Sequence, residues 1–128
     1  MNSIFNKICI SSDHAGYETK EFIKDLLIKS KISTVDLGPF LNKSVDYPDY
    51  AKKVSNRVSK RKSEIGILVC GSGTGMAISA NKTKGIRAVV GYNIKSTQLS
   101  RQHNNANVLC LGSRLTKRKD IKKIIKIF

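Results

Sequence analysis

Cys70 and the glycines that follow it form the stretch of this sequence best suited to chemistry. Residues 65–70 are a short apolar run that ends at the cysteine, and the next residues are Gly71-Ser72-Gly73-Thr74-Gly75. Glycines at this place let the backbone turn sharply and bring amide N–H groups close to an anion. The positive field of such a loop favours a thiolate over a thiol. The pattern fits a sulfur base or nucleophile beside amide donors, and equally a buried structural cysteine before a tight turn.

The glycine spacing separates this loop from two better-known phosphate-binding motifs. The dinucleotide-binding motif places its third glycine later, and the P-loop ends in Lys followed by Ser or Thr. The loop here continues into Met76 instead. A nicotinamide or a nucleoside triphosphate is therefore not the ligand that we expect.

Two further groups carry side chains that could transfer protons or bind polar ligands. Asp13 and His14 follow an apolar segment. They fit an acid–base pair at a strand end, or a helix-capping aspartate beside a partly exposed histidine. His103 lies in a helix-like segment and, taken alone, is more typical of a surface residue than of a catalyst. Cys9 and Cys110 fall inside apolar runs, and we interpret both as packing residues.

Alternating strands and helices are expected to position these residues. The apolar patterns predict strands at residues 7–12, 32–37, 65–70, 85–90 and 107–112, and helices at 17–29, 47–62, 76–84, 96–103 (capped by Ser96) and 121–128. The predicted fold class is α/β, a single Rossmann-like doubly wound domain over residues 1–128 with a mainly parallel five-stranded sheet. Ligands of such sheets bind beyond the carboxyl ends of the strands, which is where Asp13, His14 and residues 70–75 are expected to converge. His103 and Asn104 precede the last strand and would need a favourable helix placement or a second subunit.

Composition and charge indicate which classes of protein this sequence does not fit. The chain has 128 residues and no apolar run near the roughly 20 residues that span a bilayer, so we expect no membrane segment. Residues 1–7 lack an apolar core, so we expect no signal peptide, and three widely spaced cysteines fit a reducing cytoplasm. The net charge of +15 comes mainly from scattered lysines that are not interleaved with aromatic residues. The sequence therefore favours a solvated basic surface that attracts a small phosphorylated substrate over a nucleic-acid site.

Several separated motifs occur in one order along the chain. They are Ser12-Asp13-His14-Ala15-Gly16, Val45-Asp46-Tyr47-Pro48-Asp49-Tyr50-Ala51, Cys70-Gly71-Ser72-Gly73-Thr74-Gly75, Ala80-Asn81-Lys82, Gly85-Ile86-Arg87-Ala88, Leu99-Ser100-Arg101-Gln102-His103-Asn104 and the stretch from Asn107 to Arg114. Together they resemble the type B ribose-5-phosphate isomerases, a family that also contains the galactose-6-phosphate isomerase subunits. The resemblance covers residues 8–114, nearly the whole chain.

The resemblance implies an aldose–ketose isomerase that interconverts ribose 5-phosphate and ribulose 5-phosphate without a metal or other cofactor. By this resemblance Cys70 is the base that moves a proton between C1 and C2, and His103 acts in opening the sugar ring. Asp13 and His14 would bind the sugar and its phosphate. Further contacts to the substrate are implied for Tyr47, Asn104, Arg114 and the glycine loop, Gly71, Ser72, Gly73, Thr74 and Gly75.

The resemblance also implies a homodimer or a dimer of dimers, with each site shared between subunits. Members of the family usually carry arginines beyond the last strand that grip the phosphate, whereas here Arg118 is the only arginine after Arg114. Whether lysines and Arg118 take their place is left open by the sequence. Galactose 6-phosphate or another six-carbon sugar phosphate is the alternative substrate, and a basic nucleic-acid-binding module is the alternative from another class.

Overall fold

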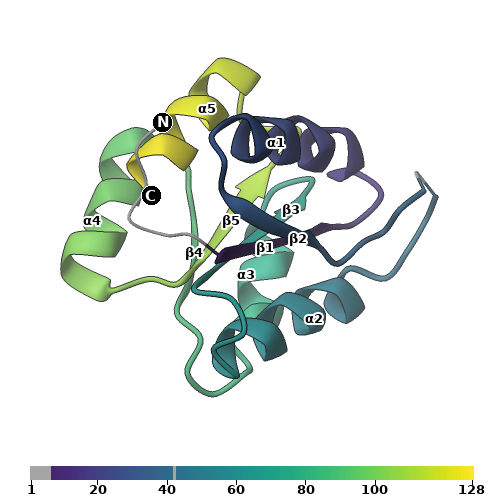
Figure 1. The fold of residues 1–128 in the computed structure, drawn as a ribbon, viewed down its shortest axis with the longest axis horizontal. Coiled ribbons are helices and arrows are strands. Elements are labelled where there is room, and N and C mark those ends of the chain that lie inside the picture. Colours follow the sequence, from purple (N-terminus) through teal and green to yellow (C-terminus); the bar gives the residue numbers. More distant parts are fainter. Residues whose placement is uncertain (1–6, 42) are drawn as a thin grey trace.

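A five-stranded parallel sheet organises the part of the chain that the structure describes, residues 7–41 and 43–128 of a computed structural model (Figure 1). The strands are β1 (Lys7–Ser12), β2 (Ser33–Asp36), β3 (Ile65–Cys70), β4 (Ala88–Val90) and β5 (Val108–Gly112). Their order across the sheet is β2-β1-β3-β5-β4, and every pair is parallel. The chain reverses its direction of winding between β1 and β3, which makes the carboxyl ends of these two strands the expected ligand position.

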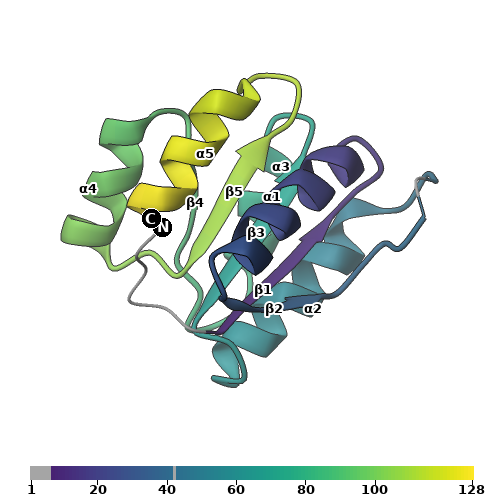
Figure 2. The ribbon, with the colours of Figure 1, turned by 45° about the horizontal axis from the view of Figure 1, so that its top comes forward.

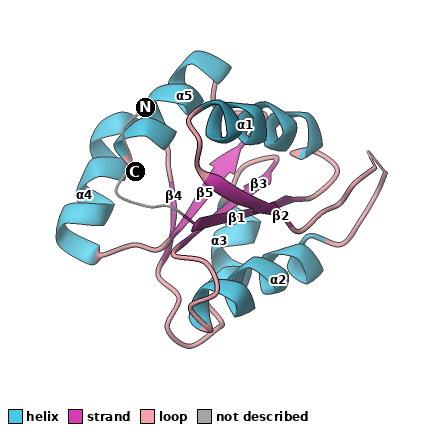
Figure 3. Cartoon of the chain, in the orientation of Figure 1, coloured by secondary structure: helices cyan, strands magenta, loops and turns pink. Residues whose placement is uncertain are grey.

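Helices cover both faces of the sheet, as Figures 2 and 3 show. They are α1 (Tyr17–Lys29), α2 (Tyr47–Ser59), α3 (Thr74–Ala80), α4 (Ile94–Asn104) and α5 (Arg118–Ile127). Helices α1 and α5 pack on one face, α2 and α3 pack on the other, and α4 lies beside α5 near the β4 edge. The predicted doubly wound α/β fold is therefore confirmed.

Alternation along the strands divides the core into two layers. In β3, Ile65, Ile67 and Val69 face α1 and α5, whereas Leu68 and Cys70 face α2 and α3. All six residues of β3 are buried. Burying a large aliphatic side chain contributes about 1.5–3 kcal/mol, so a strand of this composition is stable only with helices on both faces.

Several observed boundaries differ from the predicted ones, in two cases where a side chain bonds to the backbone. The predicted cap Ser96 is wrong: Asn93 caps α4, and its side-chain oxygen accepts the Ser96 N–H at 2.8 Å. Strand β4 begins at Ala88 rather than at residue 85, because Asn107 Oδ1 accepts the Arg87 N–H at 2.8 Å before the ladder starts. Helix α3 is shorter than predicted and ends at Ala80.

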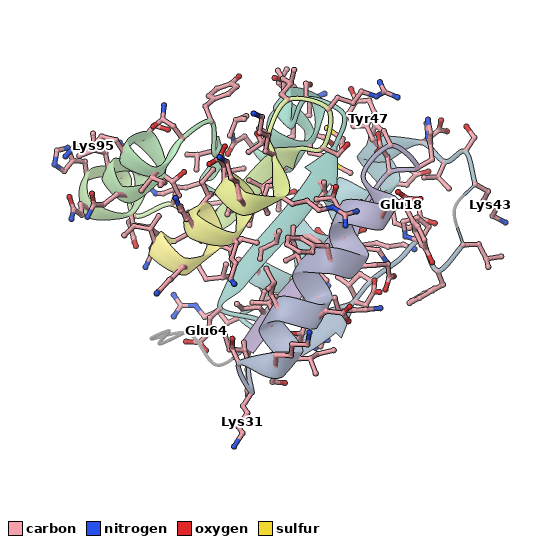
Figure 4. The ribbon with its side chains drawn as sticks, turned by 90° about the horizontal axis from the view of Figure 1, so that it is seen from above. Glu18, Lys31, Lys43, Tyr47, Glu64 and Lys95 are labelled. Atoms are coloured by element: carbon pink, nitrogen blue, oxygen red, sulfur yellow. The ribbon has the colours of Figure 1, made fainter. Side chains whose placement is uncertain are left out.

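The carboxyl ends of the strands, called the carboxyl edge of the sheet below, and their amino ends, called the amino edge, lie on opposite sides of the molecule. Figure 4 shows Tyr47 and Glu18 at one end of the molecule and Glu64 and Lys31 at the other. The first end carries the carboxyl ends of the strands and the second their amino ends. Within the described ranges, no helix has the length and apolar character needed to cross a membrane.

Candidate active site

A cavity of about 360 Å³ opens at the carboxyl edge of the sheet, at the reversal point between β1 and β3. Its lining residues come from four separate segments and are Asp13, Tyr47, Cys70, Gly71, Ser72, Gly75, Arg114 and Leu115. All of them except Leu115 are residues that the sequence singled out. The topology thus brings together side chains that lie up to a hundred positions apart in the chain.

Cys70 lies at the floor of this cavity. It is the last residue of β3, it is only 6% exposed, and its sulfur accepts a hydrogen bond from the Gly73 N–H at 3.1 Å. Gly73 has φ of 85°, a left-handed conformation that glycine adopts without strain and that turns its amide back toward the sulfur. Hydrogen bonding of this kind stabilises negative charge on the acceptor. The sulfur therefore combines access to a cavity with a donor aimed at it.

The other two cysteines have a different environment. Cys9 and Cys110 are fully buried and do not line this cavity, which confirms their interpretation as packing residues. Burial raises the pKa of both thiols, and the nearby Cys70 sulfur raises that of Cys110 further. Both thiols are therefore less acidic than an exposed cysteine.

Arg114 and Tyr47 close over the glycine loop. A Cβ atom added at Gly71 would lie 3.2 Å from Arg114 Nη1, and one added at Gly75 would lie 3.0 Å from the Tyr47 ring. The backbone ties the same segments together, since the Ser113 N–H donates to the Cys70 carbonyl at 2.8 Å and the Arg114 N–H to the Gly71 carbonyl at 3.0 Å. The missing side chains at these two glycines allow a cation and an aromatic ring to approach the loop.

Asp13 also lines this cavity. It is 9% exposed, its Oδ1 accepts the Gly16 N–H at 3.0 Å, and its own N–H donates to the Val69 carbonyl at 3.1 Å. Asp13 is not the N-cap of α1, because that residue is Gly16 and it has no side-chain cap. The carboxylate instead closes the turn before the helix and lines the cavity, and acid–base work by Asp13 and His14 stays a prediction.

A second cavity of about 560 Å³ adjoins the first and shares Arg114 with it. Its ionisable lining residues are His14, Glu18, Arg114, Lys117 and Arg118. Three permanent cations against one carboxylate make this space suited to an anion. The Arg118 guanidinium lies over the Phe22 ring, 5.2 Å from its centroid, which holds that cation in place.

His103 and Asn104 are not part of either cavity. They end α4, where both are exposed, and the Arg87 guanidinium donates to the Asn104 carbonyl at 3.4 Å just before β4 begins. This position is at the amino edge of the sheet, the opposite end from Cys70. A strand of six residues is about 20 Å long, so His103 and Cys70 of one chain do not meet.

Sequence reasoning did not single out Leu115 in the first cavity, nor Glu18, Thr19 and Thr116 in the second. Leu115 is 66% exposed in a polar turn, and an apolar residue directly after Arg114 was the available signal. In residues 7–41 and 43–128 no group of three or more His, Cys, Asp or Glu side chains could hold a metal ion. The two cavities offer a thiol, main-chain amide donors and cations for chemistry on an anionic, polar ligand.

Comparison with known proteins agrees with this arrangement. Residues 8–128 match the family described as Ribose/Galactose Isomerase. The probable ribose-5-phosphate isomerase B of Mycoplasma genitalium is 42% identical over 123 residues, covering 94% of this chain and 81% of that protein. The ribose-5-phosphate isomerase B of Escherichia coli is 44% identical over 109 residues, covering 85% and 73%.

Solved structures give the same result. The ribose 5-phosphate isomerase of Thermotoga maritima matches with a TM-score of 0.95 at 43% identity, covering 98% of this chain and 86% of that one. The Mycoplasma genitalium enzyme with bound ribulose-5-phosphate matches with a TM-score of 0.91 at 42% identity, covering 94% and 81%. The chain therefore belongs to the Ribose/Galactose Isomerase family.

Proposed function

We propose that this protein is an aldose–ketose isomerase that interconverts ribose 5-phosphate and ribulose 5-phosphate, with Cys70 as the base. The observation that carries the proposal is the Cys70 sulfur at the floor of the cavity, 3.1 Å from the Gly73 amide nitrogen. Family membership and the related structure with bound ribulose-5-phosphate support this substrate. In metabolism, this activity would be a step that interconverts pentose phosphates.

The chemistry requires a base and a site for a negative oxygen. The Cys70 thiolate removes the proton from C2 of the open-chain aldose, and the carbonyl at C1 becomes the enediolate oxygen. Return of the proton to C1, with transfer of the O2 proton to O1, gives the ketose. Amide donors of residues 71–75 and the Ser72 hydroxyl stabilise the intermediate. One such preorganised donor contributes about 3–4 kcal/mol to the transition state.

The substrate extends from one cavity into the other. With its reacting carbons at Cys70 and its hydroxyls at Asp13 and Tyr47, the phosphate lies past Arg114, near His14. The Arg114 guanidinium lines both cavities and so contacts the chain of the sugar and its phosphate. A five-carbon sugar phosphate places its charge at the far end from the carbonyl, in agreement with the separation of the sulfur from the basic cavity.

The ring-opening group comes from a second copy of the chain. His103 and Asn104 are exposed at the amino edge, so they complete a site only when a neighbouring subunit presents them to Cys70. This requires at least a homodimer with shared sites. Cys9, Cys70 and Cys110 are free, and we place the protein in a reducing compartment, the cytoplasm, where Cys70 is not oxidised to a disulfide.

A coupled assay of ribose 5-phosphate turnover tests the base. Cys70→Ala should keep its fold and lose at least about a hundredfold in kcat, the usual contribution of a positioned base. Cys110→Ala is the matched control, since it removes a buried thiol from the neighbouring strand without touching the cavity. Equal turnover by Cys70→Ala and Cys110→Ala would refute the proposal.

Mixing two inactive variants tests the shared site. When Cys70→Ala and His103→Ala subunits are unfolded and refolded together, half of the dimers are mixed, and each mixed dimer has one intact site. The mixture should therefore regain about a quarter of the wild-type activity. Recovery should be absent when the Cys70→Ala partner is instead the double variant Cys70→Ala/His103→Ala. An inactive mixture of the two single variants would show that Cys70 and His103 act from the same chain.

A further inference from the structure

Lys20 is a fully buried lysine that the proposed reaction does not use. It lies one turn into α1, and its side chain is 0% exposed. The three donors of its ammonium group meet Asp36 Oδ1 at 2.9 Å, Asp36 Oδ2 at 2.8 Å and the Pro39 carbonyl at 2.8 Å. The Tyr17 and Phe40 rings lie over it at 5.1 and 5.6 Å. A buried charge with all its donors satisfied fixes its partners tightly, because any displacement leaves a charge unpaired.

The ion pair holds the turn that follows β2. Asp36 ends β2, and its Oδ1 also accepts the Gly38 N–H at 2.9 Å. Lys20 binds the carbonyl of the next residue, Pro39. Gly38 is therefore held from both sides, by the carboxylate before it and by the ammonium after it, and both Gly38 and Pro39 are buried.

The Gly38 carbonyl in turn holds the end of β1. It accepts the Ser12 N–H at 3.2 Å and the Ser11 hydroxyl at 2.7 Å. Asp13 is the next residue, and it leaves the strand from this point to form the wall of the Cys70 cavity. A continuous set of hydrogen bonds thus leads from the Lys20 ammonium, through the Gly38 turn, to the residue before Asp13.

We propose that Lys20 and Asp36 are positioning residues for the substrate site, which set the place of Asp13 at the cavity through the Gly38 turn. Neither side chain lines the cavity, so their effect reaches the substrate only through Asp13. The expectation about catalysis rests on the proposed function, in which Asp13 binds the sugar. The structural claim, that Lys20 holds Ser12 and Asp13 in place, does not depend on the proposed function.

Steady-state kinetics of Lys20→Met, alone and combined with Asp13→Asn, test the proposal. Lys20→Met should raise KM for ribose 5-phosphate about tenfold with kcat changed less than about threefold, as when one hydrogen bond to bound substrate is misplaced. In the Asp13→Asn background the same substitution should leave KM unchanged. A purely structural role would lower the active fraction, and hence kcat, in both backgrounds.

Lys24→Met is the matched control. Lys24 also donates to Asp36 Oδ2, at 2.9 Å, but it does not reach Pro39 and is partly exposed. Its KM should stay within about twofold of wild type, since the Gly38 turn keeps its contacts. If Lys20→Met is too unstable to assay, Lys20→Met/Asp36→Asn replaces it, because the pair is removed without leaving a buried charge.

Amide hydrogen exchange gives a readout that is independent of turnover. After correction for global stability, the Ser12 amide should exchange at least about fivefold faster in Lys20→Met than in Lys24→Met. Equal exchange in the two variants, or an equal rise in KM with and without Asp13, overturns the inference. Absence of wild-type turnover would refute the proposed function instead, and the exchange comparison would still decide whether Lys20 holds this segment.

Discussion

Gly112 lies where β5 passes closest to the glycine loop, so a methyl group there should act on catalysis more than on folding. It pairs with Cys70 in the sheet, and a Cβ added to it would lie 2.7 Å from the carbonyl carbon and oxygen of Ser72. Ordinary contacts of this kind begin at 3.4 Å. In Gly112→Ala the loop must therefore retreat by about 0.7 Å, and the atoms that move are backbone atoms directly after Cys70.

The expected loss follows from that displacement. A misplacement near 1 Å costs about a hundredfold in rate, so Gly112→Ala should lose about 10- to 100-fold in kcat/KM. Its free energy of unfolding should fall by only about 1–3 kcal/mol, the usual cost of an added methyl group in a packed site. The coupled assay gives the first quantity and urea unfolding gives the second.

Gly85→Ala is the matched control for this prediction. Gly85 has φ of 87° with nothing within 4 Å of an added Cβ, and it precedes β4 at the opposite edge of the sheet. Its alanine variant should lose about 1–2 kcal/mol of stability from left-handed strain and keep wild-type turnover. Wild-type kcat/KM in Gly112→Ala would refute the reasoning, because the loop position would then not matter to the reaction.

Two further outcomes are expected from single substitutions. Arg114→Lys should raise KM for ribose 5-phosphate about tenfold with less effect on kcat, because a lysine cannot make the bidentate contact to phosphate; an unchanged KM would remove Arg114 from the phosphate site. The pKa of Asp36 is lowered because, although burial opposes it, hydrogen bonds from Lys20, Gly38 and Lys24 stabilise the carboxylate. Its stabilising effect is therefore complete above the unfolded value of 3.8 and is lost as the pH falls through the folded pKa. Urea unfolding should show a difference between wild type and Asp36→Asn that shrinks in acid, whereas a constant difference would contradict this origin.

The secondary structure was predictable because its signal is local. Each buried strand is a short apolar run, and the apolar positions of the helices recur every three or four residues. The errors fell at boundaries, where a single side chain such as Asn93 or Asn107 competes for backbone donors. Such competition depends on partners that are distant in the chain or on exact geometry.

The burial of Lys20 was missed although a signal was present. Lys20, Ile23 and Leu27 are spaced by three and four residues on α1 and so share one face. A lysine on an apolar face is normally placed in solvent by its long side chain. Only the approach of Asp36 at the end of β2 and of Pro39 in the turn that follows makes the buried position stable.

The sequence by itself determined the α/β class, the order of the elements and the residue types that line the cavity, because these depend on periodicity and on motifs that are continuous in the chain. The tertiary structure decided what could not be read locally. It placed the Cys70 sulfur between the buried core and an open cavity, and it joined that cavity to the basic one through Arg114. It also placed His103 at the amino ends of the strands, away from Cys70. Each of these depends on how parallel strands and their crossover helices pack in three dimensions, since each crossover helix returns the chain to the amino ends of the strands.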